Sequence, residues 1–384
     1  MSTRDAAIIG IADSEVGRLP GVTTLDLTAR VASAAVADAG LDLGDVDGLI
    51  TTVPLVGAFP RHAVAVAEYL GIPEQLRHCA SVSLGGASAL AGLLDAVRLV
   101  RTGTCRSVMV LAADTPRSGQ DRSASVSAFS GMRHPAWEQP FGMLNVSAYA
   151  LLAQAYLHRF GLEVEALASM PVAMREHAAG NPRASYREPL STSDVAASRL
   201  VSSPLHLLEC SPISDGAGAV IVGQPGSGSS TGKHIGLLGG SQGYVYDHVA
   251  YAGDLSRTGC SLSSRRALDA AAVGVDDVDV ALLYDSYSIT LALELEEIGI
   301  CPPGGAPEFV ASGGISLGGR MPTNTHGGLL SHAHCGGAAG IHHITESVRQ
   351  LSGQAANQVT GATVALLHAE GGILSANCTA VLAR

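Results

Sequence analysis

Residues 85–99 read GGASALAGLLDAVRL, and this stretch decides the fold because residues 336–351, GGAAGIHHITESVRQL, repeat its pattern in the other half of the chain. The Gly-Gly-Ala start and the later Val-Arg pair fall at the same offset in both copies. Each copy reads as a glycine turn that opens a helix. The chain therefore consists of two halves with the same local pattern.

Two further pairs of similar segments flank these helices. Upstream, residues 35–50 and residues 267–283 both read as a helix end, an acidic turn and a hydrophobic strand. Downstream, residues 105–114 and residues 362–370 are short apolar strands. Three matching segments in the same order predict an internal repeat that builds one pseudo-symmetric domain. We expect the functional site at the loops that open the two Gly-Gly helices.

The predicted organisation is a first half over residues 1–223 and a second half over residues 234–384, joined by a Gly/Ser-rich segment. Apolar strands alternate with helical patterns in the first part of the chain, which is typical of an α/β sheet covered by helices. Over residues 115–204 this alternation stops. We interpret that region as a loop insertion with helical stretches. Because it holds the only tryptophan, Trp137, we expect it to cover the site or to pair subunits.

The composition narrows the possible functions. With 47% hydrophobic residues among 384, the chain can bury a large core. A net charge of -11 without a Lys/Arg cluster argues against nucleic-acid binding. Neither a secretory leader nor an apolar stretch of about 20 residues is evident, so we expect a cytoplasmic protein without a membrane span. Seven cysteines without CxxC spacing argue against disulfides and against a zinc site.

Six motifs carry a family resemblance: SDGAGAVIV, QPFGMLN, REHAAGNPRA, PLHLLEC, YDSYSIT and NTHGGLLSHAHCGGAAGIHHITESVRQL. Together they resemble the thiolase superfamily over essentially the whole chain, and within it the lipid-transfer-protein-like group. The resemblance implies an α/β thiolase fold, with two pseudo-symmetric βαβαβαββ halves in a five-layer αβαβα arrangement. The group is similar to acyl-CoA thiolases and also includes aldolases that cleave β-hydroxyacyl-CoA side chains, those of steroids among them.

The resemblance identifies candidate site residues one at a time. Gly85 stands where a thiolase has its nucleophilic cysteine, and His368 of HAEGG stands where it has the second cysteine. His334 matches the histidine of the Gly-His-Pro loop, and Tyr284 opens the segment that replaces the Asn-Glu-Ala-Phe loop. Both thiols of a thiolase are therefore absent. A tyrosine and a histidine occupy the positions that, in the family, hold an oxygen near the thioester.

These residues favour retro-aldol cleavage of a β-hydroxyacyl-CoA, which needs no covalent intermediate. The reaction needs a base for the β-hydroxyl proton and donors for the enolate that forms as the carbon–carbon bond breaks. The predicted catalytic residues are Tyr284, His334, His368 and Asp285, and the predicted substrate-binding or oxyanion residues are Gly85, Gly86, Tyr287, Gly336 and Gly371. Structural roles stay open for Tyr284 as a strand end, Asp285 as a helix cap and His368 as a buried polar group.

Two other functions stay open. An acyltransferase of thiolase type would use a non-standard nucleophile, for which the candidates are Cys79, Cys335, Ser83 and Ser88. A non-catalytic subunit would bind a lipid-like ligand or acyl-CoA without turning it over. The identity of the acyl chain, a steroid or related side chain, is implied by the resemblance alone.

No cofactor is predicted for this chain, because its glycine-rich loops lack the spacing of a dinucleotide or phosphate loop. Coenzyme A is expected as the carrier of the substrate. A histidine-rich stretch contains His326, His332, His342 and His343. Helical spacing puts the last two on different faces, so we expect no metal. The resemblance implies a homodimer that is joined through the first-half sheet. Two copies of a small OB-fold protein flank this dimer and complete a heterotetramer. The zinc of the assembly is expected in the zinc ribbon of the OB-fold protein.

Overall fold

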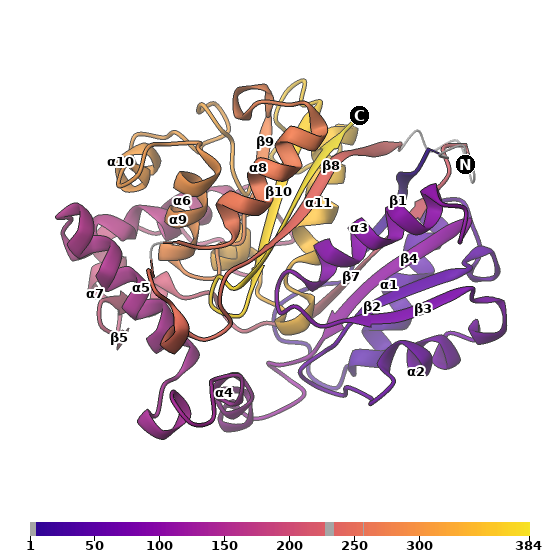
Figure 1. Ribbon diagram of the computed structural model, residues 1–384, viewed down its shortest axis with the longest axis horizontal. Coiled ribbons are helices and arrows are strands. Elements are labelled where there is room, and N and C mark those ends of the chain that lie inside the picture. Colours follow the sequence, from indigo (N-terminus) through magenta and orange to yellow (C-terminus); the bar gives the residue numbers. More distant parts are fainter. Residues whose placement is uncertain (1–4, 227–233, 256) are drawn as a thin grey trace.

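A nine-stranded sheet runs through the protein in the computed structural model, which describes residues 5–226, 234–255 and 257–384 (Figure 1). The first half contributes, in spatial order, β3 (His78–Val82), β2 (Gly48–Thr52), β4 (Ser107–Asp114), β7 (Gly216–Gly223) and β1 (Ala7–Asp13). The second half continues with β8 (Ile235–Tyr244), β11 (Ala376–Ala383), β10 (Val364–Gly371) and β9 (Val280–Leu282). Two residue pairs between β1 and β8 join the two parts.

The second half repeats the strand pattern of the first. In the first half β2 runs parallel to β4, which pairs antiparallel with β7. In the second half β9 runs parallel to β10, which pairs antiparallel with β11. β3 lies parallel to β2 on its other side, and its counterpart is a single parallel bridge between Thr323 and Ala281. The predicted internal repeat is therefore confirmed, with one strand of the second half reduced to one bridge.

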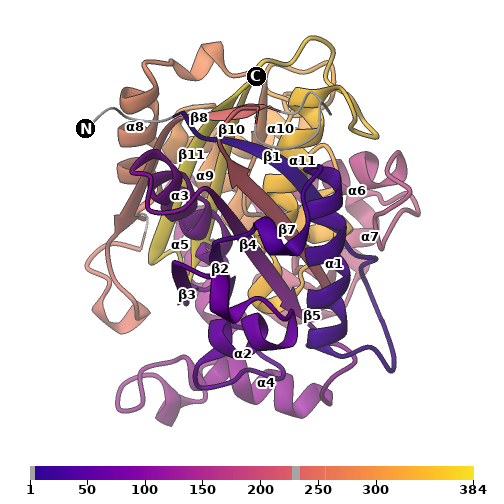
Figure 2. The ribbon, with the colours of Figure 1, turned by 90° about the vertical axis from the view of Figure 1, so that its right-hand side faces the viewer.

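Helices cover both outer faces of the sheet (Figure 2). α1 (Thr24–Asp38) and α2 (His62–Tyr69) pack on the first half, and α8 (Cys260–Ala271) and α9 (Ser288–Ile298) pack on the second. α1 begins at a capping box, in which Thr23 and Asp26 each bond the other's backbone N–H. Within the described residues, no helix has both the length and the apolar character that crossing a membrane requires.

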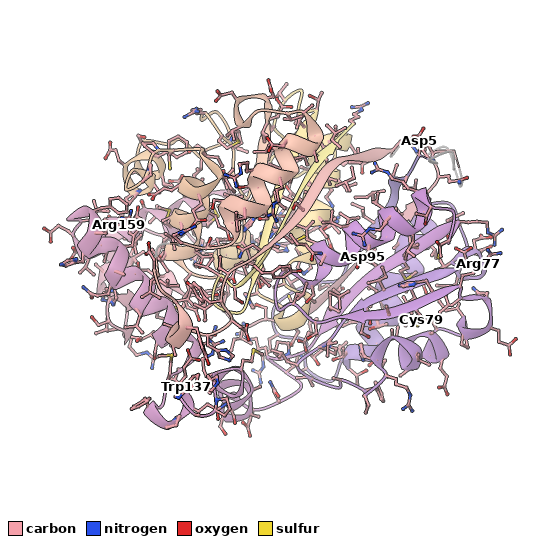
Figure 3. All side chains as sticks on the ribbon, in the orientation of Figure 1. Asp5, Arg77, Cys79, Asp95, Trp137 and Arg159 are labelled. Atoms are coloured by element: carbon pink, nitrogen blue, oxygen red, sulfur yellow. The ribbon has the colours of Figure 1, made fainter. Side chains whose placement is uncertain are left out.

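The insertion is mainly helical and packs on the second half. Its elements are α4 (Arg122–Gly131), α5 (Asn145–Phe160), α6 (Ser169–Ala179), α7 (Thr192–Ala197) and β5 (Leu200–Ser202), which pairs with β6 (Leu205–His206). Leu152 of α5 and Met174 of α6 share a hydrophobic core with α9 and with α10 (Ala306–Ala311). Trp137 and Arg159 mark its outer surface (Figure 3). The Gly/Ser-rich segment lies mostly outside the described residues, at 227–233.

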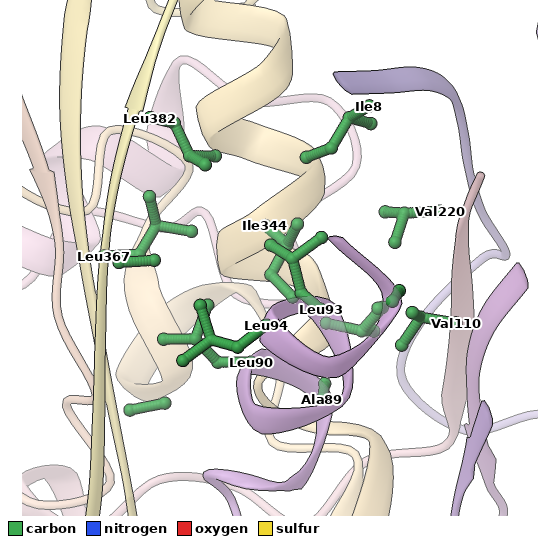
Figure 4. Close-up of a cluster of buried hydrophobic side chains, with 14 of the residues drawn as sticks. Ile8, Ala89, Leu90, Leu93, Leu94, Val110, Val220, Ile344, Leu367 and Leu382 are labelled. Carbon is green, nitrogen blue, oxygen red and sulfur yellow. The ribbon is translucent and has the colours of Figure 1, made fainter. Parts of the chain in front are cut away.

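The two Gly-Gly helices form the middle layer of the protein. They are α3 (Ser88–Arg101) and α11 (Ile341–Ser352), and they lie in contact between the two parts of the sheet (Figure 4). Leu93 of α3 packs in one core with Leu367 of β10 on the second-half side and Val110 of β4 on the first-half side. The five-layer αβαβα arrangement is thus confirmed, with the duplicated motif at its centre.

A buried carboxylate connects the two halves at the end of β4. Asp114 accepts N–H bonds from Leu55 (2.8 Å), Val56 (3.1 Å) and Thr115 (2.9 Å) of the first half. It accepts another from Gly337 (2.8 Å), in the glycine turn of the second half. Burial raises the pKa of Asp114 to about 6 in spite of these bonds. One side chain thus satisfies backbone donors from separate segments of both halves.

We expect Asp114→Asn to destabilise the protein by roughly 3 kcal/mol, because the amide NH₂ would face backbone donors where a carboxylate oxygen now accepts. Urea unfolding followed by circular dichroism measures the loss. Asp269→Asn, on the exposed side of α8, is the control and should change the free energy of unfolding by less than about 0.5 kcal/mol. An unchanged midpoint for Asp114→Asn would contradict the role given to this carboxylate.

Candidate active site

A cleft of about 480 Å³ opens where the two glycine turns meet. Both halves and the insertion line it. The lining includes Ser83, Gly85, Gly86 and Ser88 of the first half, Met132, Leu144, Asn145 and Tyr149 of the insertion, and Tyr284, Ser286, Tyr287, His334, Gly336, Glu370 and Gly371 of the second half. The first turn of α5 forms one wall of this cleft, which fits the expectation that the insertion covers the site and leaves its other alternative, the pairing of subunits, as a prediction.

Tyr284 and His334 form a hydrogen-bonded pair in this cleft. The Tyr284 hydroxyl lies 3.2 Å from Nε2 of His334. The backbone N–H of Tyr284 donates to Oε2 of Glu294 at 2.8 Å, which holds the segment after β9 in place. Burial and then the charge of Glu370 raise the pKa of Tyr284 well above its ordinary value, and burial lowers the pKa of His334 to about 4. At neutral pH the phenol therefore keeps its proton and the imidazole is uncharged. With the imidazole proton on Nδ1, Nε2 accepts the hydrogen bond of the phenol.

The first glycine turn leaves room for Tyr284. A Cβ atom on Gly86 would overlap with Cζ and the hydroxyl of Tyr284. A Cβ on Gly85, whose φ is +57°, would lie 2.9 Å from Cα of Gly371 at the end of β10. The phenol thus fills the space beside Gly86, and backbone at the end of β10 fills the space beside Gly85, where the resemblance would place the side chain of a nucleophile.

All five predicted binding residues line the cleft. The neighbouring N–H of Ala87 is already bonded to the carbonyl of Leu84 at 3.2 Å, so the start of α3 does not offer it to a substrate oxygen. The ring of Tyr287 stacks on that of Tyr149, with centroids 4.3 Å apart. The predicted binding residues are Gly85, Gly86, Tyr287, Gly336 and Gly371.

Asp285 lies behind the cleft rather than in its lining. Its carboxylate accepts the N–H groups of Leu329 (2.7 Å) and Leu330 (3.1 Å) and the side-chain amide of Asn324 (2.8 Å). Leu329 and Leu330 belong to the π-helical turn that leads to His334. Burial raises the pKa of Asp285 to about 8. Its placement does not fit the predicted contact with substrate, and it ties the segment after β9 to the loop before His334 instead.

His368 is also buried away from the cleft. Its Nδ1 lies 2.8 Å from the hydroxyl of Thr379, and its Nε2 lies 3.2 Å from Oδ1 of Asn377. Both partners belong to β11, the neighbouring strand. The structural role that the sequence left open therefore fits the placement of His368, and direct contact with a substrate does not.

Glu370 lines the cleft, although the sequence prediction does not include it. Its Oε1 accepts bonds from the hydroxyls of Tyr149 (2.6 Å) and Ser286 (3.2 Å), and its Oε2 accepts the N–H of Leu374 (3.1 Å). Burial raises the pKa of Glu370 to about 7. This carboxyl group therefore changes its protonation state near neutral pH, which suits a group that transfers protons.

The internal repeat does not identify Glu370. Asp114, the last residue of β4, pairs with the first residue of β7, and Gly371, the last residue of β10, pairs with the first residue of β11. Asp114 therefore corresponds to Gly371, and Glu370 lies one residue earlier, on the other face of its strand. Asp114 is saturated by backbone N–H groups, whereas Glu370 is held mainly by side-chain hydroxyls and faces the cleft. The two carboxyl groups thus have different partners, and only Glu370 lines the cleft.

The two candidate nucleophilic cysteines lie outside the cleft lining. Cys79 is on β3, toward the far side of the first half from Trp137 (Figure 3), and burial raises the pKa of its thiol. Cys335 is buried, and burial raises the pKa of its thiol well above its ordinary value. Ser83 and Ser88 do line the cleft, but the Ser88 hydroxyl already donates to the carbonyl of Gly85 at 2.6 Å. The geometry thus disfavours Cys79, Cys335 and Ser88 as the nucleophile of an acyl-enzyme.

Comparison with known proteins identifies the family. The family described as "Thiolase C-terminal domain-like" matches residues 241–384. The "Steroid side-chain-cleaving aldolase" of Thermomonospora curvata is 33% identical, with 96% of this chain and 95% of that protein covered. The chain belongs to the thiolase superfamily.

Within the superfamily, the chain falls in the lipid-transfer-protein-like group that lacks the thiolase cysteines. The "17-hydroxy-3-oxo-4-pregnene-20-carboxyl-CoA lyase" of Mycobacterium tuberculosis is 33% identical, with 97% of this chain and 98% of that protein covered. The solved structure named "Ltp2-ChsH2(DUF35) aldolase" is 31% identical and superposes with a TM-score of 0.87, covering 100% of this chain and 98% of that one. The thiolase fold expected from the motifs is therefore confirmed.

We expect Gly86→Ala to displace the Tyr284 phenol and to lower turnover by about 100-fold or more, because a catalytic group misplaced by about 1 Å loses that much. A crystal structure of the variant and its turnover number measure both effects. Gly44→Ala is the control, since a Cβ there meets no atom within 4 Å, and it should retain wild-type turnover. Full activity in Gly86→Ala would show that the position of this phenol does not matter.

Proposed function

We propose that this protein is a carbon–carbon lyase that cleaves a β-hydroxyacyl-CoA by retro-aldol chemistry, with a steroid or related side chain as the acyl group. The observation that carries the proposal is the Tyr284 phenol at the start of α3, 3.2 Å from His334 and in one cleft with Glu370. Proton-transfer groups thus line the cleft of a chain that lacks both thiols of a thiolase. The names of two relatives, an aldolase and a CoA lyase, support the reaction class.

The first step removes the β-hydroxyl proton. The His334 imidazole is uncharged at neutral pH, because burial lowers its pKa to about 4. It takes up the proton through the Tyr284 hydroxyl, which donates its own proton to Nε2 as it receives one from the substrate. The bond between Cα and Cβ then breaks, the aldehyde or ketone forms, and the electron pair stays on the thioester as an enolate.

Glu370 completes the reaction by protonating Cα of the enolate. Burial raises its pKa to about 7, so a large fraction of it is protonated at neutral pH. When Glu370 carries the proton, the Tyr149 hydroxyl can turn to the carbonyl oxygen of Gly372, which lies 3.0 Å away. The products are the carbonyl compound and a shortened acyl-CoA. His334 ends the cycle with one proton more, and Glu370 with one proton fewer.

A small OB-fold partner is part of the proposal. The similar structure has two components in its name, which supports a partner subunit. The insertion exposes large apolar side chains beside the cleft, and such a patch is typical of protein–protein contacts. They are Met132, Trp137, Phe141 and Leu144. In this arrangement coenzyme A is the substrate carrier, the partner completes its site and carries zinc in its ribbon, and the present chain needs no cofactor.

A homodimer through the first-half sheet completes the proposed heterotetramer. β3 is an edge strand, with β2 as its neighbour on one side. An unpaired strand edge is a natural site for pairing with a second chain. The adjacent helix α2 exposes Val64 and Tyr69, which adds apolar surface beside that edge.

Co-expression with any OB-fold protein encoded beside this chain, followed by incubation with a panel of β-hydroxyacyl-CoA thioesters, tests the function. We expect release of an aldehyde or ketone, detected by mass spectrometry. Tyr284→Phe and His334→Ala should each lower it by at least about 100-fold, as loss of a proton-transfer group does. An acyl mass on the protein would favour the acyltransferase instead, and no reaction across the panel would favour a non-catalytic subunit.

The pH profile of kcat tests the assignment of Glu370. Because Glu370 acts in its protonated form, kcat should fall as the pH rises through about 7, and because His334 acts uncharged, kcat should fall as the pH drops through about 4. Glu370→Gln should lower kcat by about 100-fold and remove the alkaline limb. Glu308→Gln, exposed on α10, should keep both limbs. An alkaline limb that persists in Glu370→Gln would assign the acid role to another group.

A further inference from the structure

A row of buried histidines leads away from the cleft behind Tyr284. The ring centroid of His343 lies 6.1 Å from that of Tyr284. From His343 the centroid separations along the row are 5.2 Å to His326, 5.0 Å to His332 and 5.2 Å to His342. The four side chains are between 1% and 6% exposed. No step of the proposed reaction uses any of them.

The row ends at a second cavity of about 210 Å³, whose lining has no described residue in common with that of the cleft. Three histidines of the row line it, together with Asp13, Arg183 and Arg349. Oδ1 of Asp13 lies 3.3 Å from Nδ1 of His342, and Oδ2 lies 2.6 Å from Arg349. The side chain of Arg183 is 61% exposed, so this cavity reaches the protein surface. The row therefore joins the cleft to a separate opening.

Most nitrogens of the row are not used by the protein. Both ring nitrogens of His326 and of His343, and Nε2 of His342, have no hydrogen-bond partner among the described residues. A buried polar atom left without a partner costs about 1–3 kcal/mol, so five such atoms do not serve stability. The adjoining polar cavity is large enough to admit water, which can bond to imidazole nitrogens.

We infer that these four histidines form a water-bridged proton path between the Tyr284–His334 pair and the second cavity. The inference rests on the proposed function, in which His334 gains one proton and Glu370 loses one in each turnover. The proton on His334 leaves along the row, from His343 to His342, and is released at the second cavity. Glu370 regains a proton from water once the products have left the cleft, so that protons balance over the cycle.

The charges along the row suit this direction. Oδ1 of Asp285 lies beside the inner end, 3.9 Å from Nε2 of His343, but burial raises the pKa of Asp285 to about 8, so this group is mostly uncharged at neutral pH and does not hold the proton there. Burial lowers the pKa of His343 and of His332 to about 3 and that of His326, which lies between them, well below its ordinary value, so none of these three rings retains a proton at neutral pH. At the outer end burial opposes ionisation of Asp13, but Arg349 and His342 hold its pKa below the ordinary value. An ionised carboxylate therefore draws the proton outward. Glu346, whose pKa is raised by burial, and Arg183 are further ionisable groups in the cavity wall.

His326→Phe interrupts the row and tests the path in the assembled enzyme. With enzyme in excess and rapid quenching, the rate of the first turnover should stay within about twofold of wild type, because the cleft is intact. Steady-state kcat should fall by about tenfold or more, and added imidazole should restore it, because regeneration of His334 has become limiting. His62→Phe removes an equally buried imidazole with an unpartnered Nδ1 on α2, and it should leave both rates unchanged.

Other outcomes separate the path from the proposed function. An equal loss of the first-turnover and steady-state rates without rescue by imidazole would assign His326 a structural role and overturn the path. A steady-state kcat equal to that of wild type would overturn it as well. His332→Gln, which keeps a polar side chain, repeats the comparison if His326→Phe does not fold. A wild-type complex that cleaves no thioester would contradict the proposed function, and it would overturn the proton path as well, because the path rests on that function.

Discussion

The contact between the two glycine turns constrains the rest of the structure. A Cβ atom on Gly340 would overlap with the carbonyl oxygen of Gly86, and one on Gly371 would overlap with the carbonyl oxygen of Leu84. Backbone meets backbone here, which glycine alone permits. The contact lets α3 and α11 begin side by side, and the two halves of the repeat share one core because their central helices pack together.

The same contact creates the site and sets its chemistry. Because no side chain fits at Gly86, the reacting groups must come from other elements: Tyr284 from the end of β9, Glu370 from β10 and Tyr149 from the insertion. Rigid elements at the centre of a protein hold such groups well. Their burial also shifts their pKa values, upward for the carboxyl and phenol groups and downward for the imidazole of His334. The core that stabilises the fold therefore also decides which groups carry protons.

The sequence predicts the architecture because the duplication leaves a visible pattern of glycines and strand ends. It also places Tyr284 and His334 in one cleft, since both replace residues of recognisable loops. It does not distinguish Glu370 from His368, which lie two residues apart on one face of β10. Which of the two side chains reaches the cleft depends on hydrogen-bond partners from β11 and from the insertion. Such partners are distant in sequence, so the local sequence pattern does not indicate them. The burial of Asp285 has the same origin, because the π-helical turn that covers it is distant in sequence.

The insertion links the order of synthesis to the order of folding. α5 and α6 leave the ribosome before α9 and α10, with which they share a hydrophobic core. The apolar faces around Leu152 and Met174 therefore lack their packing partners until the ribosome has synthesised the chain to about Ala311. Contacts between such distant segments slow folding, since a long loop must close before they form. Although the halves look alike, the first half alone lacks the helices that bury the apolar faces of its insertion, so these faces are buried only once the second half is present.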